Sequence, residues 1–181
     1  TPSVTIQRKG LDQAIIHIGG HACPAQNHLE NAAFHVLAQI LGGDLSSRMF
    51  YILREKYGYA YQCGFEFSSI KNLGYWYAYA LCDAKSYRDC LRLMQEILCD
   101  VTENGVHADE LDSAKKYLIG MSRFDHESVS FRASSIANLI ALGYDLEFYL
   151  SREQRIRDVS AELIHDLAAK WLSERYVHVV V

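Results

Sequence analysis

One stretch of this chain decides how the rest can be organised, and it reads GGDLSSR at residues 42–48, LREK at 53–56 and GYAY at 58–61. After the glycine pair, we expect Ser46 to cap a short helix by accepting a hydrogen bond from its first free N–H groups. Gly58 is expected to end that helix in a left-handed conformation. Arg54 lies in the last turn, where the helix dipole favours a cation. Tyr61 enters the strand that follows, so the pattern brings an arginine and a phenol to one place.

The bulk properties favour one domain over residues 1–181 and exclude several classes of partner. Half of the 181 residues are hydrophobic, which suits a sizeable core. The net charge is −4 with both signs interspersed, so we expect neither nucleic acid nor an anionic membrane surface as a partner. No apolar run reaches the roughly 18 residues of a spanning helix. The chain starts at Thr1 without a methionine, so we expect a piece cut from something longer.

Five cysteines without C-x-x-C spacing favour a reducing compartment. We therefore expect a cytoplasmic protein, or a mitochondrial matrix protein if the chain is eukaryotic. The cysteines at positions 63, 82, 90 and 99 fall on apolar faces or strand positions, so buried thiols are expected there rather than nucleophiles. Ser46-Ser47 lacks the G-x-S-x-G pattern of a nucleophile elbow.

Hydrophobic periodicity predicts the fold class. A period of two over residues 59–67 and 75–81 predicts a hairpin, and β-branched runs predict strands at 4–8, 14–18 (closed by Gly19-Gly20) and 177–181. Helical spacing predicts helices at 27–41, 111–121 and 133–140. Caps predict three more, at 86–105 with a capping box of Ser86 and Asp89, at 145–156 capped by Asp145, and at 160–171 capped by Ser160. This order predicts an α+β fold, a two-layer sandwich in which helices cover one face of a mostly antiparallel sheet.

The hairpin carries a row of tyrosines, Tyr75, Tyr77 and Tyr79, on one face. Two interpretations compete for this row. Aromatic side chains often fill the faces of sheets, so packing is the favoured interpretation over a recognition platform.

Eight histidines raise the question of a metal site. Two pairs have short spacing, namely His17 with His21 and His28 with His35. The first pair is separated by two glycines, and the second lies on a helix that is otherwise core-facing or polar surface. His107 and Glu110 begin like the zinc motif H-x-x-E-H, but Leu111 occupies the fifth position and cannot bind a metal. We therefore expect no metal or other cofactor in this chain.

The central stretch resembles the G-G-x-x-S-S-R-L-F…L-R-E-x-x-G-L-A-Y block of the insulinase/pitrilysin zinc metallopeptidases. It is most similar to the second, non-catalytic half-domain of the processing-peptidase-like branch. The likeness extends to ELDSAK at 110–115, VSAE at 159–162 and the valine-rich end at 176–181. Tyr59 replaces a leucine of the block, and His107 stands where a threonine or serine cap is usual.

The resemblance implies two similar half-domains that close like a clamshell on a peptide substrate. The first carries H-x-x-E-H, a distal glutamate ligand and the zinc. The second supplies an arginine and a tyrosine, at the positions of Arg54 and Tyr61. By this resemblance the chain is the substrate-binding half of a zinc metalloendopeptidase, inactive alone, whose zinc lies on a homologous half-domain in the same longer chain or in a separate subunit. A homodimer is a further arrangement left open.

A second function remains open. A degenerate member of the same family can serve as a structural or assembly subunit, as in respiratory-complex core proteins. Arg54 and Tyr61 favour the peptidase interpretation, because degeneration would remove them without penalty. A stand-alone metallohydrolase is disfavoured because the chain shows no ligand set.

Overall fold

The computed structural model describes residues 4–5, 10, 12–125, 127–173 and 176–181. Its centre is a five-stranded sheet in the order β1-β5-β2-β4-β3. The strands are β1 Val4–Thr5, β2 Gln13–Ala22, β3 Ala60–Ile70, β4 Leu73–Asp83 and β5 Val177–Val180. All neighbouring strands run antiparallel except β1 and β5, which pair in parallel. The predicted, mostly antiparallel sheet is confirmed.

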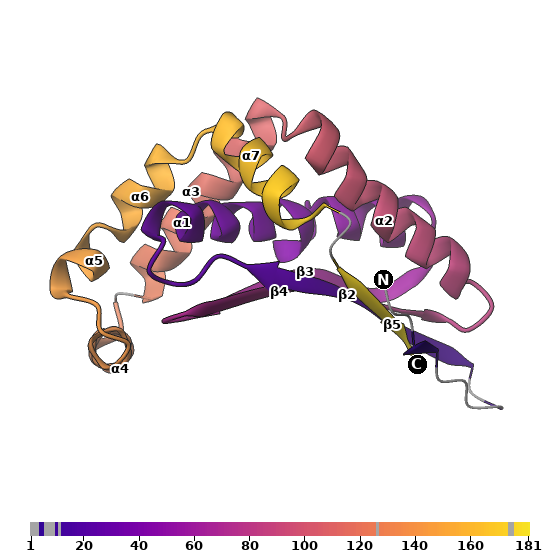
Figure 1. Cartoon of the computed structure of the whole chain (residues 1–181), viewed down its shortest axis with the longest axis horizontal. Helices are drawn as coiled ribbons and strands as arrows, with labels where there is room; N and C mark the ends of the chain where they lie inside the picture. Colours follow the sequence, from indigo (N-terminus) through magenta and orange to yellow (C-terminus); the bar gives the residue numbers. More distant parts are fainter. Residues whose placement is uncertain (1–3, 6–9, 11, 126, 174–175) are drawn as a thin grey trace.

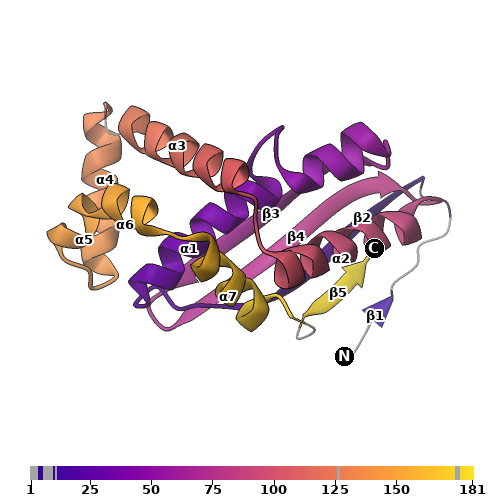
Figure 2. The same ribbon diagram turned by 90° about the horizontal axis from the view of Figure 1, so that it is seen from above.

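The helices cover one face of this sheet and leave the other face open (Figure 1). They are α1 His28–Ala38, η1 Gln39–Gly43, η2 Phe50–Lys56, α2 Tyr87–Asn104, α3 Ala108–Asp125, α4 Val129–Ala141, α5 Leu146–Leu150, α6 Arg152–Asp158 and α7 Ala161–Trp171. Figure 2 shows α4 and α5 beyond the end of the sheet where β3 turns into β4. The two-layer α+β sandwich expected from the sequence is therefore confirmed.

Strand alternation places the core between the sheet and the helices. On β4, Trp76 and Ala78 are buried, and the Trp76 ring stacks on Phe65 of β3 with 5.4 Å between centroids. Tyr77 and its neighbours Tyr75 and Tyr79 lie on the opposite face, where they contact one another and His17 of β2. The tyrosine row therefore packs against itself on the open face of the sheet.

The glycine pair in β2 does not end that strand, so this expectation is wrong. Pairing with β4 runs through Gly19 and Gly20 as far as Ala22, which lies opposite Gly74. A Cβ at Gly19 would lie 2.9 Å from the Trp76 carbonyl oxygen. Glycine allows this close approach of two backbones, so the pair fits the strand into the sheet. Residues 6–9 of the expected first strand lie outside the described ranges.

The predicted helix starts are confirmed in part. Asp145 accepts a hydrogen bond from Phe148 N at 2.8 Å, and Ser160 accepts one from Leu163 N at 3.1 Å. Ser86 makes no such side-chain bond, so the expected capping box there is wrong. The segment 145–156 is two short helices rather than one, divided at Ser151. Among the cysteines expected to be buried, Cys99 is exposed.

Candidate functional site

The segment 42–61 begins where α1 continues into the wider turn of η1. A Cβ at Gly42 would collide with the backbone nitrogen of Phe65, so glycine is what lets this helix end lie against β3. The turn that follows is held by Asp44, whose Oδ1 accepts hydrogen bonds from Ser46 N at 2.7 Å and Ser46 Oγ at 2.6 Å. Ser46 is thus a donor within the turn, and the expectation that it caps the next helix is wrong.

The short helix η2 is a π-helix, and it ends where the sequence predicts. Tyr57 N donates to Ile52 O at 3.2 Å, the five-residue step of a π-turn. Gly58 adopts φ +64°, the left-handed conformation expected for it. A π-turn has more residues per turn than an α-helical turn. The side chains near the end of η2 therefore point in other directions than α-helical spacing predicts. Arg54 is one of these side chains, and it is exposed.

Arg54 and Tyr61 lie next to each other. Arg54 contacts the backbone of Tyr61 rather than its side chain, which sequence spacing alone does not show. The Nη1 of Arg54 donates to the backbone carbonyl of Tyr61 at 3.1 Å. The guanidinium also lies over the ring of Phe50, 5.1 Å from its centroid. The Tyr61 hydroxyl points elsewhere and donates to Oδ1 of Asp83 at 2.8 Å. The hydrogen bond to Asp83, followed by the charge of that carboxylate, raises the pKa of Tyr61, so the phenol stays protonated.

A β-bulge gives Tyr61 this exposed position. Ala60 pairs with Cys82 and Gln62 with Leu81, so Tyr61 is an extra residue on β3. Strict alternation over residues 59–67 would put Tyr61 on the same face as Phe65, which is buried, and the bulge breaks that relation. Instead, half of the Tyr61 side chain is exposed, at 50%. Bulges commonly re-aim a side chain in this way, and this one lies at the start of the edge strand.

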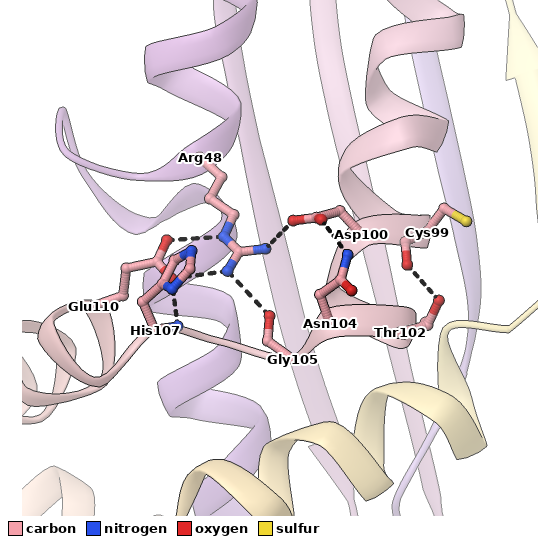
Figure 3. A network of polar contacts seen from close by, with 8 residues as sticks. All are labelled: Arg48, Cys99, Asp100, Thr102, Asn104, Gly105, His107 and Glu110. Atoms are coloured by element: carbon pink, nitrogen blue, oxygen red, sulfur yellow. Dashed lines mark hydrogen bonds and ion pairs between the residues drawn. The ribbon is translucent and has the colours of Figure 1, made fainter.

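A second arginine of the same segment, Arg48, is the centre of a polar network (Figure 3). Its Nε and Nη2 donate to the two carboxylate oxygens of Glu110, both at 2.8 Å. Nη1 donates to Asp100 at 2.8 Å and Nη2 to the carbonyl of Gly105 at 3.1 Å. Only 10% of the Arg48 side chain is exposed. Arg48 therefore joins the start of η2 to the connection between α2 and α3.

Glu110 completes this network. Its Oε2 also accepts the backbone N–H of His107 at 2.9 Å, which fixes the first turn of α3. Burial raises the pKa of Glu110, but the hydrogen bonds from Arg48 and His107 and the charge of Arg48 outweigh burial, and the pKa lies below its usual value. In the sequence, Arg48 and Glu110 belong to two separate motifs and lie 62 residues apart. Only tertiary structure identifies them as partners.

Comparison with known proteins identifies the family of this fold. Residues 1–118 match the family described as the peptidase M16 inactive domain. The chain belongs to that family. The resemblance to the non-catalytic half-domain of the insulinase-type zinc peptidases is thereby confirmed.

Two relatives show how such domains occur. An uncharacterized zinc protease of Mycobacterium tuberculosis is 28% identical over 177 residues, which are 97% of this chain and 40% of the relative. The non-peptidase homolog YmxG of Helicobacter pylori is 26% identical over 158 residues, 87% of this chain and 37% of that protein. This M16 inactive domain thus spans about two fifths of the curated relatives that it matches.

Solved structures share the fold at lower identity. A peptidase M16 inactive domain from Pseudomonas fluorescens superposes with a TM-score of 0.86 at 20% identity, over 98% of this chain and 42% of that one. A chain of Complex III2 from Candida albicans gives 0.82 at 17% identity, over 99% of this chain and 45% of that one.

The described donor side chains of this M16 inactive domain do not form a ligand set for a zinc ion. Within residues 4–5, 10, 12–125, 127–173 and 176–181, no three His, Cys, Asp or Glu side chains gather as metal ligands. Glu110, half of the partial zinc motif, gives both oxygens to Arg48. His28 of the helical pair packs edge-on against Phe148, 4.4 Å between centroids. The absence of zinc from the purified chain remains a prediction for metal analysis.

In the part of the chain that the structure describes, no helix is both long and apolar enough to cross a bilayer.

Proposed function

We propose that this chain is the substrate-binding half of a zinc metalloendopeptidase, and that Arg54 and Tyr61 contact the peptide. Zinc would be bound by a homologous half-domain, in the same longer chain or in a separate subunit. The observation that carries the proposal is the exposed Arg54–Tyr61 pair, presented by a π-helix end and a β-bulge. Relatives named zinc proteases, of which this chain spans two fifths, support a missing half. Five cysteines without C-x-x-C spacing support a reducing compartment, cytoplasmic or the mitochondrial matrix.

Tyr61 is suited to stabilise charge on a substrate. Hydrolysis of a peptide places negative charge on the carbonyl oxygen in the transition state, and a positioned hydroxyl donor lowers that barrier. The raised pKa keeps this phenol protonated at neutral pH. In the isolated domain the Tyr61 hydroxyl donates its hydrogen bond to the Asp83 carboxylate. In the complex, a carbonyl oxygen of the peptide would replace this carboxylate as the acceptor.

Arg54 is suited to hold the peptide backbone. A guanidinium has five N–H donors in a fixed fork, and the contacts described for Arg54 use one of them. The remaining donors are free to bind carbonyl oxygens of an extended peptide. Zinc on the other half-domain would supply the activated water, while the residues of this chain bind and orient the substrate.

The test is kinetic and uses the chain assembled with its zinc half. Tyr61→Phe is expected to lower kcat and kcat/KM together, by about 10²-fold, because the hydroxyl acts only in the transition state. Arg54→Ala is expected to lower kcat/KM with a larger share in KM. Tyr57→Phe is the matched control, an exposed tyrosine of the same segment, and should leave turnover unchanged. If Tyr61→Phe and Arg54→Ala both turn over substrate at the wild-type rate, the assignment of Arg54 and Tyr61 as substrate contacts is wrong.

A structural or assembly role is the second candidate. The Helicobacter pylori relative carries the name non-peptidase homolog, which favours this role for at least one similar protein. The two candidates differ in what the assembled protein does. Chelator-sensitive peptide cleavage by the complex with the zinc half supports the first. A stable complex with no cleavage, and a partner sequence without H-x-x-E-H, supports the second.

A further inference from the structure

A cavity of about 340 Å³ lies away from Arg54 and Tyr61, where α4, α5 and α6 meet α1 and α3. Much of its wall is apolar, made by Ala25, Ala32, Leu118, Phe131, Leu139, Leu142, Phe148 and Ile156. This volume is within the range of sites for small ligands. The wall is also ordered by ring contacts, since Phe148 stacks on Tyr144 at 4.1 Å between centroids. The cavity therefore has the size and surface of a binding site.

Two arginines give this apolar cavity positive charge. Arg152 and Arg155 both line it, and no aspartate or glutamate does. Across the described ranges neither guanidinium forms an ion pair with a carboxylate, whereas the nearby Arg123 and Arg157 both pair with Glu153. Two cations that line one cavity, without a carboxylate in its lining, favour an anionic ligand.

Arg155 is held rigidly at this wall. Its Nη1 donates to the Phe148 carbonyl at 2.7 Å and to Ser151 Oγ at 2.6 Å. The guanidinium lies 3.8 Å from the centroid of the Phe148 ring. Burial, followed by the charge of Arg152, lowers the pKa of Arg155, so like charge faces like charge along this wall. An anion between them would relieve that repulsion.

Neutral polar groups complete the lining. The Tyr144 hydroxyl is buried and has no hydrogen-bond partner within the described residues, so a donor is left for a ligand. His35 also lines the cavity, and desolvation by the surrounding protein, followed by the charges of Arg152 and Arg155, lowers its pKa to about 4. It is therefore neutral at pH 7 and adds no charge. A buried donor without a partner is costly, and a bound acceptor would remove that cost.

We propose that this cavity binds a carboxylate carried on a short apolar body. The carboxylate would accept hydrogen bonds from Arg152, Arg155 and Tyr144, and the body would lie against Leu139 and Leu142. A free medium-chain fatty acid and the hydrophobic C-terminus of a peptide share this chemistry. The site does not depend on the zinc half, so the proposal stands or falls separately from the peptidase function.

Calorimetric titration of the whole chain tests the ligand class. Octanoate represents a fatty acid, and N-acetyl-leucine represents the C-terminus of a peptide. Octanamide and N-acetyl-leucinamide are their uncharged controls, and acetate is the control without an apolar body. At least one of the two acids should bind at one site per chain, about tenfold or more tighter than its amide and than acetate, because a charge-assisted bond is lost in the controls. Preference for octanoate identifies a fatty acid, and preference for N-acetyl-leucine identifies a peptide C-terminus. No binding by either acid, or equal binding by the amides, would overturn the proposal.

Three variants test whether the acid binds in this cavity. Arg152→Gln removes a side chain without a described hydrogen bond or ion pair, so folding should persist while the acid binds about tenfold more weakly. Ser135→Phe fills the cavity and should abolish binding. Arg132→Gln removes an equal charge from exposed α4 outside the cavity and should leave the affinity unchanged. Thermal unfolding of each variant checks the fold. Equal weakening by Arg152→Gln and Arg132→Gln would show a bulk charge effect and contradict the proposal.

Discussion

Two arginines six residues apart in one segment, Arg48 and Arg54, have opposite environments. Arg48 is largely buried, with 10% of its side chain exposed, and makes four hydrogen bonds, which link the start of η2 to Glu110, Asp100 and the Gly105 carbonyl. Arg54 is exposed, and its one described hydrogen bond goes to a backbone carbonyl. The described hydrogen bonds of Arg48 stabilise the fold, whereas Arg54 keeps N–H donors that can bind a ligand. The difference teaches that one family motif contains both an anchor and a group presented to solvent.

The anchor serves the presented group. Arg48 fixes the start of η2 against the α2–α3 connection, so the far end of this short helix has a defined position. Arg54 and the bulge at Tyr61 depend on that position. A change at Arg48 should therefore act through stability, whereas a change at Arg54 or Tyr61 should act on function with little effect on stability.

The largest expected effect is that of Arg48→Ala. It leaves the half-buried Glu110 carboxylate without its partner, and we expect the free energy of unfolding to fall by about 3 kcal/mol. Denaturant unfolding of the isolated chain measures this loss. Asp100→Ala is the control, because that carboxylate is 55% exposed and should contribute less than about 1 kcal/mol. Equal losses from the two variants would contradict the assignment of Arg48 as an anchor to Glu110.

The next effect is a pH dependence carried by Glu110. Because its pKa in the folded chain lies below the ordinary 4.5, its stabilising contribution is full above about pH 4.5 and is lost as the pH falls through the lowered pKa. At pH 7, Glu110→Gln should lower the free energy of unfolding by about 1.5 kcal/mol. The difference between wild type and variant should shrink toward acidic pH. Urea unfolding at pH 7 and pH 3 tests this, and a pH-independent difference would contradict it.

A smaller effect is expected at Gly58, which follows the end of η2, the helix bearing Arg54. A Cβ there meets open space, so Gly58→Ala costs only the strain of a left-handed alanine. That strain is about 1 kcal/mol of the free energy of unfolding. Gly58→Asn is the control and should cost less, because asparagine tolerates this conformation better. Thermal unfolding of the pair measures the difference.

The smallest effect on stability is expected at the proposed site itself. Arg54→Ala and Tyr61→Phe should each change the free energy of unfolding by less than about 0.5 kcal/mol, because both side chains are exposed. Denaturant unfolding of the isolated variants provides the check. A loss comparable with that of Arg48→Ala would mean that Arg54 is a second anchor, and would erase the contrast between the two arginines.

The sequence by itself determined the features that depend on neighbours along the chain. Alternation placed Tyr75, Tyr77 and Tyr79 on one face of β4, and short-range capping chemistry identified Asp145 and Ser160 as helix starts. Gly58 was predictable because a left-handed helix end strongly favours glycine. The motif around Arg54 and Tyr61 indicated the family before any contact was known. Each of these signals lies within a few residues of its effect.

Only the tertiary structure decided the features that depend on a distant partner. The bulge at Tyr61 arises because the register of β3 is set against β4, and it reverses the face that alternation assigns. β2 continues through Gly19 because the backbone of Trp76 approaches it there. The carboxylates that bind Arg48 come from positions 52 and 62 residues further along the chain. Local propensity carries no information on such pairings, because they form only when separate elements pack together.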